Sequence, residues 1–351
     1  MGGLGTPALV AVFTVASVAT WMAGTFLSRT TDSLDVRFGL GEELGGLILL
    51  AVTGSLPEIA ITASAALAGH LGLAVGNLIG GVAIQTLVLV VLDSAAGRER
   101  PLSFLVGSLV PVLEALTVMV VLATALSGAT LAPSTNFLGA SPTSIAVCVL
   151  WVGGVWIVNR LRLHPPWVGD APESTPGRRH VRQPMEGKPH PYAHASTIVV
   201  VAIFVAASLV TLGAGVVLQE SGNALADNWG MQGAVFGATF LAAATALPEI
   251  SSGLAAVRLG DMQLAVGDIL GGNSFQITLF LLADLLAGTP VIVAAHKSDV
   301  WLGCVGVVMT GIVAAAVIVR PRRTFLTLGL DSYLLALVYA LGIAGLLHLA
   351  K

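Results

Sequence analysis

The sequence has little charge. Only 10% of its 351 residues are Asp, Glu, Lys or Arg, whereas a soluble domain usually carries about 25%. Hydrophobic residues make up 56% of the chain and recur in runs long enough for the roughly 20 residues of a membrane-crossing helix. The alternating pattern of transmembrane barrel strands is absent. Because backbone amides in lipid must be satisfied internally, these runs predict membrane-spanning helices.

Cysteine is nearly absent too. Cys148 and Cys304 each lie alone in an apolar run, which excludes a disulfide framework and a cysteine-based metal site. The net charge of −3 indicates no particular partner. We expect no cofactor and no nucleic acid, and inorganic cations and the lipid bilayer as partners. The first apolar run has no positive segment before it, so we expect residues 7–28 to be a retained helix and not a cleaved signal.

Ten apolar segments predict an all-α integral membrane protein with ten transmembrane helices. They lie at residues 7–28, 44–69, 71–93, 102–126, 142–160, 195–217, 232–257, 262–286, 299–319 and 325–348. If the N-terminus is outside, only Lys297 and Lys351 of the sixteen basic residues fall outside. The inside positions hold Arg29, Arg37, Arg98, Arg100, Arg160, Arg162, Arg178, Arg179, Arg182, Lys188, Arg258, Arg320, Arg322 and Arg323. This asymmetry matches the positive-inside rule and predicts that both termini are outside.

One long polar segment, residues 161–194, separates a first five-helix unit (1–160) from a second (195–351). It is rich in Pro, Arg and His, which predicts a flexible cytoplasmic linker. Its histidines could bind metal, but their spacing fits no compact site, so we interpret them as part of a solvated loop. They are His164, His180, His190 and His194. The short linker and compact loops favour a prokaryotic plasma membrane.

The two units contain a repeat with a constant offset of 191 positions. Residues 54–59 (GSLPEI) match 245–250 (TALPEI) in their last four letters, and residues 73–81 (LAVGNLIGG) match 264–272 (LAVGDILGG). The copies fall on predicted helices 2–3 and 7–8. Five helices separate them, an odd number, so they face opposite ways across the membrane. Inverted repeats of this kind place a binding site at the midplane, where the copies meet.

The repeated motif has the chemistry of a cation site. Pro57 and Pro248 interrupt apolar helices and free carbonyl oxygens in the preceding turn. Broken backbone inside a membrane is tolerated where it lines a cavity or an ion site. The nearby hydroxyls of Thr53, Ser55 and Thr245 add oxygen atoms, which Ca²⁺ and other hard cations prefer.

Glu58 and Glu249 are the strongest candidate ion ligands. A carboxylate at mid-membrane costs at least about 2.5–3.5 kcal/mol on insertion scales, so it is rarely present without a function. The alternative is a buried ion pair that locks helices together. No Lys or Arg lies deep in a predicted helix to act as the partner.

Other polar groups of the repeat are weaker candidates. Asn77 and Asp268 are repeat partners that either bind an ion or form interhelical hydrogen bonds. Gln85 and Gln276 are expected inside the bundle, as ligands or as hydrogen-bond partners of the glutamates. We interpret four glycines as aids to close helix packing. They are Gly80, Gly81, Gly271 and Gly272.

Four further polar residues stand apart from the motif. Asp93 and Asp284 are repeat partners near helix ends, and we expect ordinary polar end-groups there. Glu114 has no repeat partner and lies well inside predicted helix 4, either on a proton path or paired across the bundle. His70 falls in a tight outside turn, where we expect it to be solvated.

At these residues the sequence resembles the calcium/cation antiporter superfamily, which includes the sodium/calcium exchangers. The resemblance is carried by the paired LPE motifs, each followed by VG[ND]xxGG at the spacing of the family. It implies ten helices as two inverted five-helix repeats. It also implies that Glu58 and Glu249 are the central Ca²⁺ ligands, with backbone oxygens near Gly54 and Thr245 contributing.

The sequence departs from the family pattern in its hydroxyl groups. The usual motif is Gly-Thr-Ser-x-Pro-Glu, but Gly54 replaces the Thr of the first copy and Ala246 the Ser of the second. The family's Gly-Ser-Asn becomes Gly-Gly-Val at 80–82 and Gly-Gly-Asn at 271–273. Positions that are often Asn or Asp in sodium-coupled members hold glutamine in this chain. Fewer oxygens imply fewer Na⁺ sites, which slightly favours H⁺ as the counter-ion.

The leading hypothesis is therefore antiport of Ca²⁺, or a similar divalent cation, against H⁺ or Na⁺ by alternating access. A passive cation channel is the alternative, although carboxylates at helix breaks fit an occluding site better than an open pore. An intramembrane enzyme using the paired acids is less well supported, because no nucleophile–base pair or His-Glu-x-x-His motif is present. We expect no enzyme activity.

Overall fold

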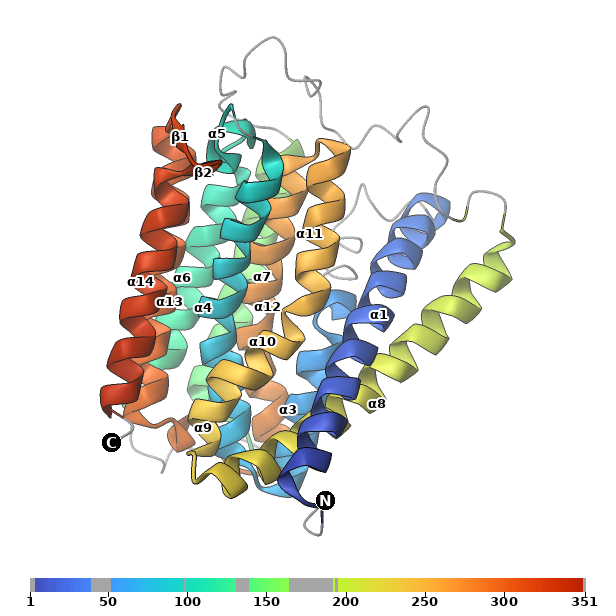
Figure 1. Cartoon of the computed structure of the whole chain (residues 1–351), viewed down its shortest axis with the longest axis vertical. Helices are drawn as coiled ribbons and strands as arrows, with labels where there is room; N and C mark the ends of the chain where they lie inside the picture. The colour runs from blue at the N-terminus through green and yellow to red at the C-terminus, as the bar shows by residue number, and fades with distance from the viewer. Residues whose placement is uncertain are drawn as a thin grey trace.

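The computed structural model is an all-helical bundle and describes residues 4–38, 52–97, 99–130, 139–163, 192 and 195–349 (Figure 1). Its elements in chain order are α1 (Thr6–Phe38), α3 (Leu56–Ala68), α4 (Leu71–Ala96), α5 (Leu102–Leu105), α6 (Val110–Gly128), α7 (Pro142–Leu163), α8 (Thr197–Trp229), α9 (Gly233–Phe236), the π-helix η2 (Gly237–Leu241), α10 (Ala242–Thr245), α11 (Leu247–Leu259), α12 (Met262–Ala287), the 3-10 turn η3 (Ile292–Ala294), α13 (Lys297–Val319), β1 (Thr324–Phe325), β2 (Leu328–Gly329) and α14 (Leu330–Leu349).

Within these ranges, nine helical segments are long and apolar enough to cross a membrane. The predicted segment 44–69 appears as α3 and the short helical stretch 52–54, while residues 39–51 lie outside the described part of the chain. Predicted helix 4 is divided into α5 and α6. Predicted helix 7 is divided into four pieces, α9 to α11, with a π-helical turn among them. The four linker histidines also lie outside the described residues.

The offset of 191 positions relates whole helices, not only the motifs. Adding it to the bounds of α1 gives the bounds of α8, and it likewise converts α3 into α11 and α4 into α12. The repeat in sequence is therefore a repeat in structure. The constant offset of 191 positions already predicted two equivalent halves, because it gives each copy of the motif the same place in its own half.

α4 and α12 are the central helices of the bundle. Buried residues fill 78% of the α4 membrane window and 61% of the α12 window, against 17% for α7. Glycine brings α4 close to the α9–η2 segment, because a Cβ at Gly76 would overlap the carbonyl of Ala234 and one at Gly80 would overlap Ala238. The glycine pairs of the repeat, Gly80–Gly81 and Gly271–Gly272, lie inside these continuous helices.

α1 and α8 lie side by side and lean away from the other helices (Figure 1). Each is 33 residues long, well beyond its predicted length. They contact the rest of the bundle through related glycines. A Cβ at Gly24 of α1 would overlap Pro248 of α11, and one at Gly215 of α8 would overlap Ala60 of α3. The long pair therefore packs against the two proline-containing helices.

Asp93 and Asp284 are buried links between the two halves. The expectation from the sequence, that they are ordinary polar end-groups, was wrong. Asp93 is 1% exposed and accepts hydrogen bonds from the amides of Leu102 (2.6 Å) and Gly329 (2.7 Å) and from the Ser332 hydroxyl (2.6 Å). Asp284 is 0% exposed and accepts from the amides of Val291 (2.6 Å) and Ser141 (2.9 Å).

The two links obey the repeat. Ser141 and Ser332 are themselves 191 positions apart, so each aspartate holds the segment that leads into the last helix of the opposite half. Hydrogen bonds to a buried charged group are among the stronger ones in proteins. The two aspartates thus fasten α14 to α4 and α7 to α12.

We predict that Asp93→Asn and Asp284→Asn destabilise the protein. An asparagine directs an NH₂ group at one of the backbone amides, and each lost bond to a charged group is worth about 1.5–3 kcal/mol. The measurement is the thermal unfolding midpoint in detergent. Asp227→Asn on the exposed end of α8 is the control, expected within about 0.5 kcal/mol of the parent. Midpoints of Asp93→Asn or Asp284→Asn equal to that control would contradict the assignment.

Candidate ion-binding site

Glu58 and Glu249 occupy equivalent places in the two halves, each in the first turn of a helix. α3 and α11 start directly after a turn, at Ser55 and Ala246, and each has its proline in the first turn. Proline is accepted at this position because the amides of a first turn have no intrahelical partner. Both carboxylates therefore project from a fresh helix N-terminus, an end that favours negative charge.

Gln85 of α4 joins the two acids. Its Nε2 donates to Oε1 of Glu58 at 3.1 Å and to Oε1 of Glu249 at 3.4 Å. The Thr245 hydroxyl is also within hydrogen-bonding reach of Glu58. The second carboxylate oxygen of each glutamate is buried and has no partner within the described ranges. The two acids of the inverted repeat therefore meet at one point and still have free acceptor capacity.

The electrostatics of this point are strongly negative. Glu249 feels the charge of both Glu58 and Asp268. Glu58 is 1% exposed, and Glu249 and Asp268 are partly buried. The donors of their hydrogen bonds are amide, hydroxyl and backbone groups. Like charges held together in a medium of low dielectric repel each other strongly. The arrangement requires a cation or bound protons to neutralise it.

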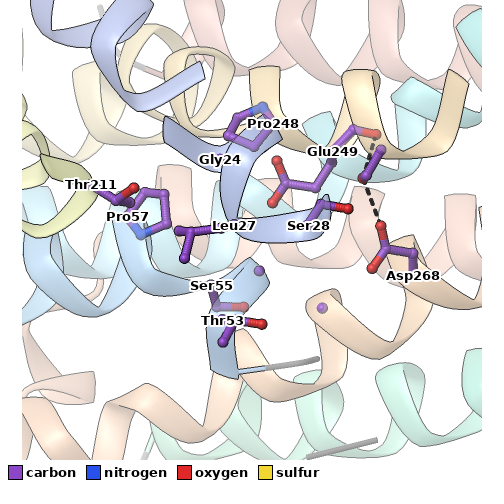
Figure 2. A pocket seen from close by; sticks show the side chains of 13 residues that line it. Gly24, Leu27, Ser28, Thr53, Ser55, Pro57, Thr211, Pro248, Glu249 and Asp268 are labelled. Atoms are coloured by element: carbon purple, nitrogen blue, oxygen red, sulfur yellow. Dashed lines mark hydrogen bonds between the residues drawn. The ribbon is translucent and has the colours of Figure 1, made fainter. Parts of the chain in front are cut away.

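A small cavity of about 50 Å³ reaches Glu249 (Figure 2). Its lining residues are Gly24, Leu27, Ser28, Thr53, Gly54, Ser55, Pro57, Thr211, Pro248, Glu249, Ser252, Asp268 and Gly272. Figure 2 shows Glu249 and Asp268 on one wall and Thr53 and Ser55 on another. The Ser252 hydroxyl donates to Asp268 Oδ2 at 2.8 Å, which ties α11 to α12 at the cavity wall.

Access to the acids is one-sided. Ser252 and Asp268 lie between Glu249 and the α11–α12 connection, so the cavity is on that side of the acids. On the side of the α3–α4 connection, a buried apolar cluster blocks the path to the acids. Its members include Leu9, Ile61, Leu73, Leu218, Phe236 and Leu241. The repeat partner of Ser252 is Ile61, which is 0% exposed, so equivalent positions are polar and open on one side and apolar and sealed on the other.

The structure brings some of the predicted site residues to the acids and gives others separate roles. Gly54, Ser55 and Asp268 line the cavity with Glu249, and Gln85 contacts both acids. Gln276, the repeat partner of Gln85, donates instead to the α4 carbonyls of Asn77 (3.1 Å) and Leu78 (2.8 Å). It fits because its neighbour Gly81 has no side chain. Asn77 is 0% exposed, and its side-chain amide has no partner in the described ranges.

Sequence reasoning missed several residues around the site. Ser28, Ser252 and Thr211 line the cavity. Only Thr211 carried a usable signal, because it has an identical repeat partner at Thr20. Ser28 aligns with Gln219 and Ser252 with Ile61, so comparing the two copies could not have selected them.

His70 and Glu114 both form contacts between helices. The expectation of a solvated His70 was wrong: it is half-buried, and its Nδ1 lies 2.7 Å from the amide nitrogen of buried Gln219. Gln219 in turn accepts from Ser64 at 2.8 Å, so this chain of contacts ties α8 to α3 at the closed end. Glu114 of α6 packs against the Gly267 backbone, next to Asp268 on α12.

Among the residues that the structure describes, no three His, Cys, Asp or Glu side chains converge as they would around a resident metal. The polar groups at the acids are amides, hydroxyls and the backbone of a broken helix. Such a set, reached from one side only and built from an inverted repeat, belongs to a membrane transporter for cations.

The chain belongs to the sodium/calcium exchanger family. The family model described as "Sodium/calcium exchanger protein" matches residues 8–159 and 198–347, one match in each half. The chain is 27% identical over 278 residues to a protein of Alkalimonas amylolytica named as an antiporter, CaxA, covering 78% of this chain and 79% of the relative.

Two solved structures share the fold. A crystal structure of an H⁺/Ca²⁺ exchanger, CAX, superimposes with a TM-score of 0.67 at 12% identity, covering 97% of this chain and 82% of the other. The sodium-calcium exchanger NCX_Mj superimposes with a TM-score of 0.58 at 16% identity, covering 96% and 98%. These findings confirm the family and the helical membrane fold expected from the sequence. The family is one of transporters, consistent with the expectation of no enzyme activity.

The different roles of the two repeat-related glutamines give a prediction. Gln276→Leu should lower the thermal midpoint, because it removes two α12–α4 hydrogen bonds worth about 0.5–1.5 kcal/mol each. If Ca²⁺ binds at the acids and raises the midpoint of the parent protein, Gln276→Leu should keep that increase. Gln85→Leu should lose most of that Ca²⁺-dependent stabilisation. Thermal unfolding with and without Ca²⁺ measures both effects. The reverse pattern would contradict the roles assigned here.

Proposed function

We propose that this protein is an antiporter that exchanges Ca²⁺, or a similar divalent cation, for H⁺. The observation that carries the proposal is the contact of one amide, on Gln85, with both Glu58 and Glu249. Two acids from opposite halves of an inverted repeat then share a single binding point. One divalent cation or two protons would neutralise them equally well, and a site that requires one or the other exchanges them.

Glu58 and Glu249 are the principal ligands in this proposal. Oxygen atoms from Ser55, Thr245 and the backbone near Gly54 complete the shell, which suits the six to eight oxygen ligands that Ca²⁺ takes. Gln85 orients the carboxylates. Three further residues take part from the periphery: Asp268 attracts the cation into the cavity, Gln276 holds α4 in place, and Asn77 occupies the position equivalent to Asp268 in the closed half.

H⁺ is preferred over Na⁺ because four positions of the repeated motif lack the hydroxyl groups that the family pattern has there. Gly54, Ala246, Gly81 and Gly272 stand where the resemblance to sodium-coupled members implies Thr or Ser. A carboxylate pair needs no further ligands to release Ca²⁺ when it is protonated. Na⁺ ions would each need their own oxygen cage.

The transport cycle is alternating access. In the described conformation the acids are reached from the α11–α12 side, and the positive-inside rule assigns that side to the cytoplasm, together with the linker at 161–194. An exchange of conformation between the two similar halves would seal this cavity and open the equivalent one on the other side. A continuous open pore is not needed, and the apolar cluster at the closed end argues against a channel.

The counter-ion is tested by Ca²⁺ uptake into reconstituted vesicles. An imposed pH gradient should drive uptake, and an imposed Na⁺ gradient of equal size should not. Lowering the pH on the Ca²⁺ side should raise the apparent KM for Ca²⁺, because protons compete for the same two carboxylates. Uptake driven by Na⁺ alone would replace H⁺ in the proposal, and uptake driven by neither gradient would refute antiport.

Glu249→Gln tests the site. It removes one charge from the pair and leaves only the Glu58 carboxylate to balance a divalent cation. We expect the apparent Ca²⁺ affinity to fall about 30-fold or more, the equivalent of at least 2 kcal/mol. Glu220→Gln, an exposed glutamate on α8, is the matched control and should transport normally. Normal Ca²⁺ flux in Glu249→Gln would refute the assignment.

A further inference from the structure

Two threonines on the long helix pair have buried hydroxyl groups that bind nothing within the described ranges. Thr20 on α1 and Thr211 on α8 are both 0% exposed, and their Oγ1 atoms have no hydrogen-bond partner. Many other helical threonines in this chain donate to the carbonyl one turn earlier, as Thr30 and Thr310 do at 2.8 Å. A buried hydroxyl left without a partner is costly, so a missing partner is expected.

Thr211 faces the cation cavity. It lies beside Pro57 in the cavity that ends at Glu249 (Figure 2). It is one helical turn before Gly215, whose Cα approaches Ala60 of α3, and residues four apart share one helix face. The contact of Gly215 therefore places Thr211 against the start of α3, whose first turn carries Glu58.

Thr20 occupies the equivalent place in the other half. It is 191 positions before Thr211, and it lies one turn before Gly24, whose Cα approaches Pro248 of α11. Thr20 is not one of the residues that line the described cavity. Thr20 is fully buried and has no access to the cavity. In a conformation with the cavity at the opposite end of the bundle, the repeat predicts that the two threonines exchange these environments.

We propose that Thr20 and Thr211 are an alternating pair of oxygen ligands for the transported cation. Thr211 binds the cation, directly or through one water, while the cavity is open toward the α11–α12 connection. Thr20 does the same in the opposite conformation, from its place against the start of α11, which carries Glu249. The inference rests on the proposed function, and it adds a ligand from α1 and α8 to a site otherwise built from the broken helices and α4.

The test is the Ca²⁺ dependence of transport in inverted and in right-side-out membrane vesicles. Thr211→Val keeps the side-chain shape and should raise the apparent KM for Ca²⁺ about tenfold on one side only, the loss expected for one hydrogen bond to a charged group. Thr20→Val should do so on the other side only. Thr211→Ser restores a hydroxyl and should recover the parent KM. Thr310→Val, at a fully buried threonine with its own carbonyl partner, should leave KM unchanged on both sides.

Three results would overturn the pairing. Thr211→Val with a normal KM on both sides removes the ligand role, even if Glu249→Gln is inactive and the antiporter assignment survives. A KM that rises on one side and falls on the other indicates a shifted conformational equilibrium and no lost ligand. A Thr211→Ser variant that behaves like Thr211→Val shows that packing, and not the hydroxyl, matters. Absence of Ca²⁺ flux in the parent protein would instead refute the proposed function.

Discussion

The interaction on which the rest of this structure depends is the meeting of Glu58 and Glu249 at the Gln85 amide. Two carboxylates in an apolar interior cannot be kept there without neutralisation, and the surrounding helices are arranged to allow it. Proline in the first turn of α3 and α11 places each acid at a helix N-terminus. The glycines of α4 let neighbouring backbone approach closely, which brings the two halves within reach of one amide. A cavity then connects the acids to one end of the bundle.

The two halves share the arrangement of their helices but differ in the contacts of several repeat-related side chains. Asp93 and Asp284 keep the same structural role, so the frame is held by equivalent links at both ends. Gln85 and Gln276 do not: one contacts the acids and the other holds backbone. A symmetric frame allows two conformations of similar energy. In the proposed transport cycle, local differences, such as serine at 252 where the other half has Ile61, decide how each end opens and what it attracts.

Membership of the sodium/calcium exchanger family agrees with the paired LPE motifs, and the shared fold with CAX and NCX_Mj extends over nearly the whole chain. The chain differs from the family pattern where Gly54 and Ala246 replace hydroxyl-bearing residues. Thr20 and Thr211 lie outside the repeated motif, and in our proposal they return hydroxyl oxygens to the site from the long helix pair. In that proposal, the number and position of these oxygens determine which ion can compete with Ca²⁺.

Much of this protein was determined by the sequence alone. Long apolar runs with little charge require membrane helices, and a repeat at a constant offset with an odd number of helices between its copies requires inversion. Two lone acids in those helices then define the site. Only the tertiary structure decided what each repeated residue contacts. Asp93 and Asp284 are buried links, His70 is held by Gln219, and Gln276 is separated from the acids. These outcomes depend on how helices far apart in the sequence pack against each other, and a repeat specifies equivalent positions without specifying their neighbours.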